Sequence, residues 1–219
     1  MPESSPGVIS LQSAELIRNE LTNYNVLLIG CGLGQHPSTV TFVKSVLFEA
    51  ISMFPPTVID ADALNILADI PEWWRKLPDS AILTPHPGEM ARLAGVPVEE
   101  VQSDRINTAK KMAEKWHKTV VLKGAYTVIA ARDGHVRISN VANPGLATAG
   151  TGDVLSGAIA GLLAQGLNNM ADAAACGVYL HAQAGEIVRE RLGDAGMIAS
   201  DLLPALPLAI KKLKENANQ

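Results

Sequence analysis

Residues 143–166 read NPGLATAGTGDVLSGAIAGLLAQG and combine a Pro/Gly turn, a loop of small residues and a strongly apolar helix. Gly150 and Gly152 allow backbone angles and close approaches that a Cβ would prevent. Thr148 or Thr151 is expected to cap the first helical turn. The unpaired N–H groups of such a helix start carry partial positive charge, which favours a phosphate or a developing oxyanion. We therefore predict an anion hole at Gly150, Thr151 and Gly152.

One acidic residue, Asp153, stands at the entrance of this helix. A carboxylate at that place can accept the proton of a substrate hydroxyl while the N–H groups hold the anionic group being transferred. Asp153 is therefore the candidate catalytic base. The alternative interpretation is a glycine-rich helix start capped by an aspartate, which the length of the pattern disfavours.

Three further blocks carry similar turn and loop chemistry: LIGCGLG at 28–34, LTPHPGEM at 83–90 and VLKGAYT at 121–127. With residues 143–166, and in this order, they resemble the ribokinase-like superfamily and, within it, the ADP-dependent NAD(P)H-hydrate dehydratases. The TPHPGE sequence is not a generic feature of small-molecule kinases, so the resemblance is specific. The family usually carries proline where this chain has Cys31.

The resemblance implies a role for residues in each block. Asp153 would be the catalytic base. The hydrated substrate would be bound by Gly32, Gly34, His86 and Asp153. The adenine nucleotide would be bound by Lys123, Gly124, Ala125, Tyr126, Thr127 and Gly152.

The implied activity is the repair of damaged NADH and NADPH. ADP, or ATP, would phosphorylate the ring hydroxyl of the (S)-hydrates NADHX and NADPHX with Mg²⁺, and elimination of phosphate would return the reduced nucleotide. A carbohydrate or vitamin-precursor kinase of the same superfamily and a non-catalytic nucleotide-binding remnant are the alternatives. Family members normally carry a further segment before the first helix, and this chain begins beyond it. We therefore expect residues 26–29 near a sheet edge and a homo-oligomer in solution.

Composition agrees with a soluble enzyme. A chain of 219 residues suits a single domain over residues 1–219. The net charge of −4, without a Lys/Arg run, gives no support for nucleic acid or an anionic membrane as a partner. Two distant cysteines suggest reduced thiols and a cytoplasmic location. The start of the chain lacks a signal peptide, and the apolar run at 154–163 is far short of the ~20 residues that span a bilayer.

Short apolar runs alternate with amphipathic segments along the chain, which predicts an α/β fold with a mostly parallel central sheet and helices on both faces. Strands are expected at 26–29, 57–60, 81–84, 120–122, 127–131 and 136–138, the last two forming an antiparallel hairpin. Helices are expected at 11–24, 38–51, 62–68, 89–94 and 103–117, and from residues 71, 154, 172 and 204. All four blocks then lie beyond the carboxyl ends of strands, where ligands bind in such sheets.

Three side chains in these blocks admit more than one interpretation. His86 is held between two prolines, which favours a hydrogen bond to substrate over a structural role. Glu89 could be a metal ligand or a helix cap, and we favour the cap. Lys123 ends a buried strand and could be a surface lysine, but its place at the mouth of the strand favours nucleotide phosphate.

Asp60, Asp62 and Asn65 form another polar cluster at a strand end, in the sequence IDADALN. Helix capping explains Asp62 well. Asp60 and Asn65 could also order the site or a hydrated Mg²⁺, which takes few carboxylates. The sequence does not identify the metal ligands.

Overall fold

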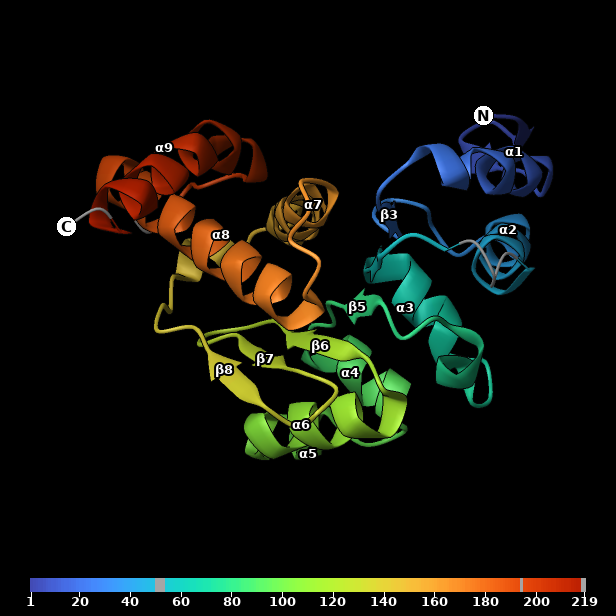
Figure 1. The fold of residues 1–219 in the computed structure, drawn as a ribbon, viewed down its shortest axis with the longest axis horizontal. Coiled ribbons are helices and arrows are strands. Elements are labelled where there is room, and N and C mark those ends of the chain that lie inside the picture. Colours follow the sequence, from blue (N-terminus) through green and yellow to red (C-terminus); the bar gives the residue numbers. More distant parts are fainter. Residues whose placement is uncertain (50–53, 194, 218–219) are drawn as a thin grey trace.

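The computed structural model describes residues 1–49, 54–193 and 195–217. Its centre is a six-stranded sheet in the order β3-β4-β5-β6-β7-β8 (Figure 1). The strands are β3 (Leu27–Ile29), β4 (Thr57–Ile59), β5 (Ala81–Leu83), β6 (Thr119–Leu122), β7 (Val128–Ala130) and β8 (Val136–Ile138). Strands β3 to β6 are parallel, and β7 and β8 add as antiparallel neighbours. This confirms the predicted fold class, the late hairpin and the place of residues 26–29 at a sheet edge.

Helices cover both faces of the sheet, as Figure 1 shows. One set comprises α1 (Gln12–Glu20), α2 (Pro37–Glu49), α3 (Ala61–Ala68), α4 (Pro87–Ala94), α5 (Val98–Ser103) and α6 (Arg105–Trp116). The other set comprises α7 (Thr151–Ala164), α8 (Met170–Leu192) and α9 (Ala199–Ala217). The short elements in the described part of the chain are β1 (Glu3–Ser5), β2 (Val8–Ile9), η1 (Leu21–Asn23), η3 (Trp73–Lys76) and η4 (Pro144–Ala147).

The alternation of side chains along the strands divides the core in two. Val58, Ile82 and Val121 pack against residues of α7 and α8. Their neighbours Ile59 and Leu83 pack against the opposite helices. Burial on both faces explains why these strands read as continuous apolar runs in the sequence. Helix α9 packs outside α8, and none of the described helices is long and apolar enough to cross a membrane.

Several predicted helix starts are wrong because the cap lies elsewhere. Helix α2 begins at Pro37 rather than at a cap formed by Ser38, since proline is favoured in the first helical position and the Ser38 hydroxyl donates to the carbonyl of Ile9 (3.0 Å). The predicted end of this helix near residue 51 lies outside the described residues. The helix expected from Pro71 is only the 3₁₀ turn η3, because Glu72 adopts left-handed angles just before it.

Three later helices begin before their predicted starts. Helix α7 begins at Thr151, α8 at Met170 after the cap Asn169, and α9 at Ala199. The prolines at 204 and 207 lie inside α9, so Pro204 does not start it. The hairpin of β1 and β2 and the short helix α5 were not predicted, since each is too short to show a clear hydrophobic period.

Candidate active site

The loops that follow β3 to β6 meet the first turn of α7 at one edge of the sheet. A cavity of about 570 Å³ opens there. The predicted residues that line it are His86, Lys123, Gly124, Ala125, Thr127, Gly150, Thr151, Gly152 and Asp153. Gly32, Gly34 and Tyr126 are not among the lining residues. The predicted residues in the lining thus come from three of the four sequence blocks.

The first turn of α7 forms one wall of the cavity. Gly150 holds a left-handed conformation with φ of +86°, which favours glycine. The Thr151 hydroxyl lies within hydrogen-bond distance of the carbonyls of Leu146 (2.7 Å) and Thr148 (2.8 Å), which share its one proton. Among the described residues no side chain caps this helix at Gly150, so the predicted capping by a threonine is wrong. The hydroxyl instead fixes the preceding loop against the helix start.

The N–H groups of this turn are the predicted anion hole. The N–H of Thr151 donates to the carbonyl of Thr148 at 3.3 Å. The N–H groups of Gly150 and Gly152 have no protein partner within the described residues. Gly150 and Gly152 therefore supply the donors of the turn, and Thr151 supports them through its hydroxyl.

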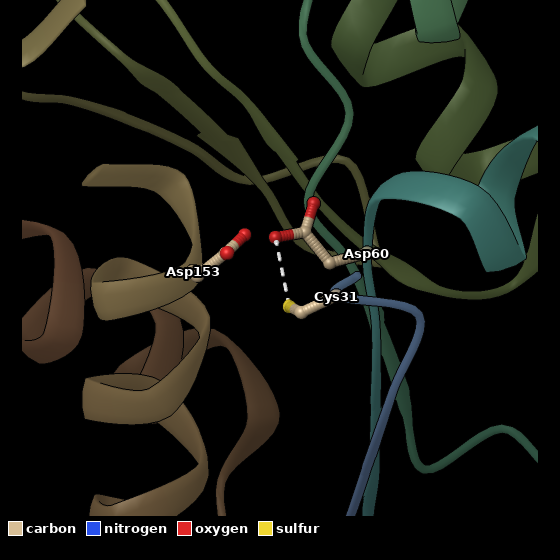
Figure 2. Close-up of side chains that lie close together, drawn as sticks. All are labelled: Cys31, Asp60 and Asp153. Atoms are coloured by element: carbon tan, nitrogen blue, oxygen red, sulfur yellow. Dashed lines mark hydrogen bonds between the residues drawn. The ribbon is translucent and has the colours of Figure 1, made fainter. Parts of the chain in front are cut away.

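Asp153 extends from α7 toward Asp60 and Cys31, as Figure 2 shows. One candidate ligand atom from each of these three residues lies within 4.8 Å of the other two. The Cys31 Sγ is 3.9 Å from Asp60 Oδ2. Burial, with the negative charges of Asp60 and Asp153, raises the pKa of Cys31 to about 12. Cys31 is therefore a protonated thiol that donates to carboxylates and is not a nucleophile.

Asp60 is the buried centre of the site. Its Oδ1 accepts from the Ala61 N–H (2.9 Å) and lies 2.7 Å from Lys123 Nζ. Its Oδ2 accepts from the Ser156 hydroxyl of α7. Asp60 is thus the cap of α3 and also joins the ends of β4 and β6 to α7. Sequence reasoning missed Ser156, although it lies only three residues after Asp153.

Lys123 faces both the buried carboxylates and the anion hole. Its Nζ is 3.7 Å from Glu89 Oε2 in addition to its contact with Asp60. A Cβ at Gly152 would lie 3.4 Å from the same Nζ, so the ammonium stands beside the first turn of α7. Two carboxylates fix this cation at the wall of the cavity.

His86 and Glu89 cap α4 together. The His86 Nδ1 accepts from the N–H groups of Gly88 (3.0 Å) and Glu89 (3.3 Å), and the His86 N–H donates to Glu89 Oε2 (2.7 Å). This confirms the capping role preferred for Glu89. Burial lowers the pKa of His86. A neutral ring that accepts at Nδ1 carries its proton on Nε2, which lies 3.5 Å from Glu89 Oε1. Nε2 is therefore the donor atom of His86, while its Nδ1 remains committed to the cap.

Asp62 has a role different from the predicted one, and the contact of Asn65 lies with α4. The Asp62 Oδ2 accepts from the Gly34 N–H (2.7 Å), so Asp62 pins the loop after β3, and the predicted capping of α3 by Asp62 is wrong because Asp60 is the cap. Asn65 Oδ1 accepts from Arg92 (2.7 Å), which ties it to α4. In the loop after β3, a Cβ at Gly30 would lie 1.8 Å from the Asp60 carbonyl oxygen. Glycine is therefore needed at Gly30 for the close approach of two strand ends.

His181 of α8 was not predicted to act in the site, yet it lines the cavity. Its Nε2 is 2.9 Å from the Thr151 carbonyl oxygen, and burial lowers its pKa to about 4. Neutral His181 donates to this carbonyl and so fixes the first turn of α7. Its spacing from other polar residues in the sequence gave no signal, because the contact joins two helices.

Comparison with known proteins identifies relatives of this arrangement. The family model described as NAD(P)H-hydrate dehydratase matches residues 4–208. A bifunctional NAD(P)H-hydrate repair enzyme of Moorella thermoacetica is 45% identical over 215 residues, which are 98% of this chain and 40% of that protein. The chain therefore spans well under half the length of that relative.

Two solved structures are similar in fold and sequence. The ADP/ATP-dependent NAD(P)H-hydrate dehydratase from Bacillus subtilis, co-crystallised with ATP and Mg²⁺, has a TM-score of 0.73 and 37% identity, covering 86% of this chain and 66% of that one. A ribokinase-like superfamily protein from Enterococcus faecalis has a TM-score of 0.76 and 30% identity, covering 94% and 69%. The fold is thus ribokinase-like, and with a family match over residues 4–208 the chain belongs to the NAD(P)H-hydrate dehydratase family.

Proposed function

We propose that this chain dehydrates the (S)-hydrates of NADH and NADPH with ADP, or ATP, as the phosphoryl donor. The observation that carries the proposal is the arrangement of Asp153, the Gly150 and Gly152 N–H groups and Lys123 around one cavity. This combination places a base, anion donors and a cation where a hydroxyl can meet a terminal phosphoryl group. The family match and the ADP/ATP-dependent relative from Bacillus subtilis support the same reaction.

In this mechanism Asp153 accepts the proton of the ring hydroxyl as the hydroxyl oxygen bonds to the terminal phosphorus of ADP. The bond from that phosphorus to the bridging oxygen breaks, and AMP leaves. Gly150, Gly152 and Lys123 stabilise the charge on the transferred group. The ring nitrogen lone pair then expels phosphate, which is a far better leaving group than hydroxide. Loss of a proton from the neighbouring ring carbon restores the double bond of NADH or NADPH.

We assign the remaining predicted residues by the resemblance and, for those that line the cavity, by their places around it. His86 would donate from Nε2 to the hydrated nicotinamide nucleotide, and Gly32 and Gly34 would form the outer part of the same substrate site. Lys123 to Thr127 would bind the adenine nucleotide, with Gly124 and Ala125 in the wall of the cavity. Tyr126 is 55% exposed and its N–H already donates to the carbonyl of Val141 (3.2 Å), so its assignment rests on the resemblance alone.

Mg²⁺ would accompany the nucleotide. Hard oxygen donors suit this ion, which keeps most of its ligands as waters and phosphate oxygens. Asp60 and Asp153 provide carboxylate oxygens beside the cavity, whereas the Cys31 thiol in the same cluster is a soft donor unsuited to Mg²⁺. When bound, the ion would neutralise charge on the nucleotide phosphates.

The test is to incubate the protein with NADH hydrate, ADP and Mg²⁺ and follow the return of reduced-nicotinamide absorbance. ATP replaces ADP in a parallel sample, and omission of nucleotide is the control. Recovery that depends on nucleotide supports the proposal. No recovery with either nucleotide would refute it, and accumulation of a stable phosphorylated product would establish a kinase instead.

A further inference from the structure

Arg105, at the start of α6, reaches the loop that follows β6. Asp104 caps this helix by accepting from the Asn107 N–H (3.1 Å), which sets the position of Arg105. The Arg105 guanidinium donates through Nη2 to the carbonyls of Leu122 (3.1 Å) and Lys123 (3.2 Å) and through Nη1 to the carbonyl of Ala125. A single side chain therefore binds three carbonyl oxygens within four consecutive residues.

Gly124 makes this contact possible. Its φ of +142° lies in a region that residues with side chains rarely adopt, and a Cβ there would lie 2.9 Å from Arg105 Nη2. The guanidinium thus packs directly against the backbone of the loop. The positive φ favours glycine at this position, and the absence of a Cβ leaves room for the guanidinium.

The carbonyl contacts determine where the N–H groups of the loop point. In a trans peptide the carbonyl and the following N–H point in opposite directions. Because the Lys123 carbonyl points to Arg105, the Gly124 N–H points away from it. Within the described part of the chain this N–H has no partner, whereas the neighbouring N–H groups of Lys123 and Tyr126 donate to Pro85 (2.8 Å) and Val141 (3.2 Å). Gly124 and Ala125 both line the cavity, and the N–H of each has no partner within the described residues. The Gly124 N–H is the one whose direction is set by the contact of Arg105 with the Lys123 carbonyl.

We infer that Arg105 is a positioning residue for the nucleotide: it binds the loop carbonyls from behind so that the Gly124 N–H faces an oxygen of a nucleoside diphosphate in the cavity. The inference rests on the proposed function for the identity of the ligand. Arg105 itself touches the loop and not the reacting atoms. It therefore acts on nucleotide binding and leaves the hydrate side of the site unchanged.

The experiment compares Arg105→Met and Arg105→Lys with the unmodified protein. ADP affinity is measured directly by calorimetry without hydrate, and the KM for ADP, the KM for hydrate and kcat are measured separately. The hydrogen bond from the Gly124 N–H to a charged phosphate oxygen would contribute about 1.5–3 kcal/mol. Arg105→Met removes the group that orients this N–H, so it should weaken ADP binding and raise the KM for ADP about tenfold or more. The KM for hydrate should change less than twofold. Arg105→Lys keeps the positive charge but loses the planar guanidinium that reaches several carbonyls at once. It should therefore give an intermediate loss of ADP affinity.

Arg137→Met is the matched control, because this exposed arginine also donates to a carbonyl, that of Ala171 (3.3 Å), and pairs with Asp172. It should leave both KM values unchanged. If Arg105→Met does not fold, Arg105→Lys carries the test.

Equal rises in the two KM values, or unchanged ADP affinity in a folded Arg105 variant, would overturn the inference while leaving dehydratase activity intact. If the unmodified protein binds ADP but does not dehydrate the hydrate, the proposed function fails and the Arg105 comparison still stands. If it binds no ADP, the inference fails with the nucleotide assignment.

Discussion

The ion pair of Lys123 and Asp60 gives the sharpest test of how this site is built. The Nζ and Oδ1 are 2.7 Å apart, and the two side chains are 19% and 1% exposed. Replacing Lys123 by methionine leaves a buried carboxylate whose remaining described donors include the Ser156 hydroxyl and the Ala61 N–H. Removing one partner of a buried pair costs about 3–5 kcal/mol, because the other charge loses its compensation.

We expect Lys123→Met to lower the free energy of unfolding by about 3 kcal/mol, the lower end of that range, because neutral donors remain on Asp60. In a chain of this size the corresponding fall in Tm is about 6–12 °C. Adding Asp60→Asn removes the second charge, so the double variant should return to within about 1 kcal/mol of the unmodified protein. Asp60→Asn alone should cost about 1 kcal/mol, since Lys123 keeps Glu89 and some contact with water.

Urea unfolding without nucleotide measures all four proteins. Lys211→Met, which removes one side of an exposed pair with Glu215, is the control and should stay within about 0.5 kcal/mol. Two results would refute the idea that this lysine compensates the charge of Asp60. One is a Lys123→Met variant as stable as the unmodified protein, and the other is a double variant whose loss in free energy of unfolding equals the sum of the two single losses. The result also determines how ADP binding by Lys123 variants is interpreted. A weaker affinity that follows from lower stability must be separated from one that follows from loss of the contact between Lys123 and phosphate.

Three other outcomes are expected. Asp153→Asn keeps the shape of the side chain but not the base, so turnover should fall at least ~10²-fold while folding and ADP binding persist; near-normal turnover would remove Asp153 from catalysis. ADP at about 100 times its Kd should add ~2.7 kcal/mol of stability, and an unchanged Tm across millimolar ADP would count against the nucleotide site. Burial lowers the pKa of His181 to about 4, so acidification from pH 6.5 toward 4 protonates this histidine in the unfolded chain first. This should remove up to about 3 kcal/mol from the free energy of unfolding. Urea unfolding at several pH values tests this, and His181→Gln should lose less stability over the same pH range. The oligomer expected from the exposed edge at β3 stays a prediction that sedimentation can test.

The features that the sequence could predict are those encoded in local patterns. The apolar runs of β4, β5 and β6 are buried on both faces, so each stands out between polar and glycine-rich segments. The proline and glycine residues around His86 mark a strand end and a helix start over only a few positions. The succession of strands and helices along the chain and the edge that carries the loops follow from such signals.

The features that escaped prediction depend on contacts between distant residues. Asp60 and Lys123 are 63 positions apart, and Ser156 reaches the same carboxylate from a third element. The sequence does not distinguish Asp60 from Asp62 as the cap of α3. Only the path of the loop after β3 shows that Asp62 accepts a hydrogen bond from the Gly34 N–H instead. Arg105 follows an ordinary helix cap, so nothing near it in the sequence indicates that it binds the loop after β6.

The contacts of the acidic residues beside the cavity explain how Asp153 can stay available as a base near the Lys123 ammonium. The Lys123 ammonium stands beside the first turn of α7, and a base next to it would be expected to pair with it. Asp60 and Glu89, both buried, already flank its ammonium, and Glu89 is committed further to the cap of α4. Asp153 is instead exposed on the first turn of α7, where its described neighbour Cys31 is a protonated thiol. In the mechanism that we propose, the buried carboxylates would thus hold the lysine in place for the phosphoryl group, and Asp153 would be left to take the proton of the hydroxyl.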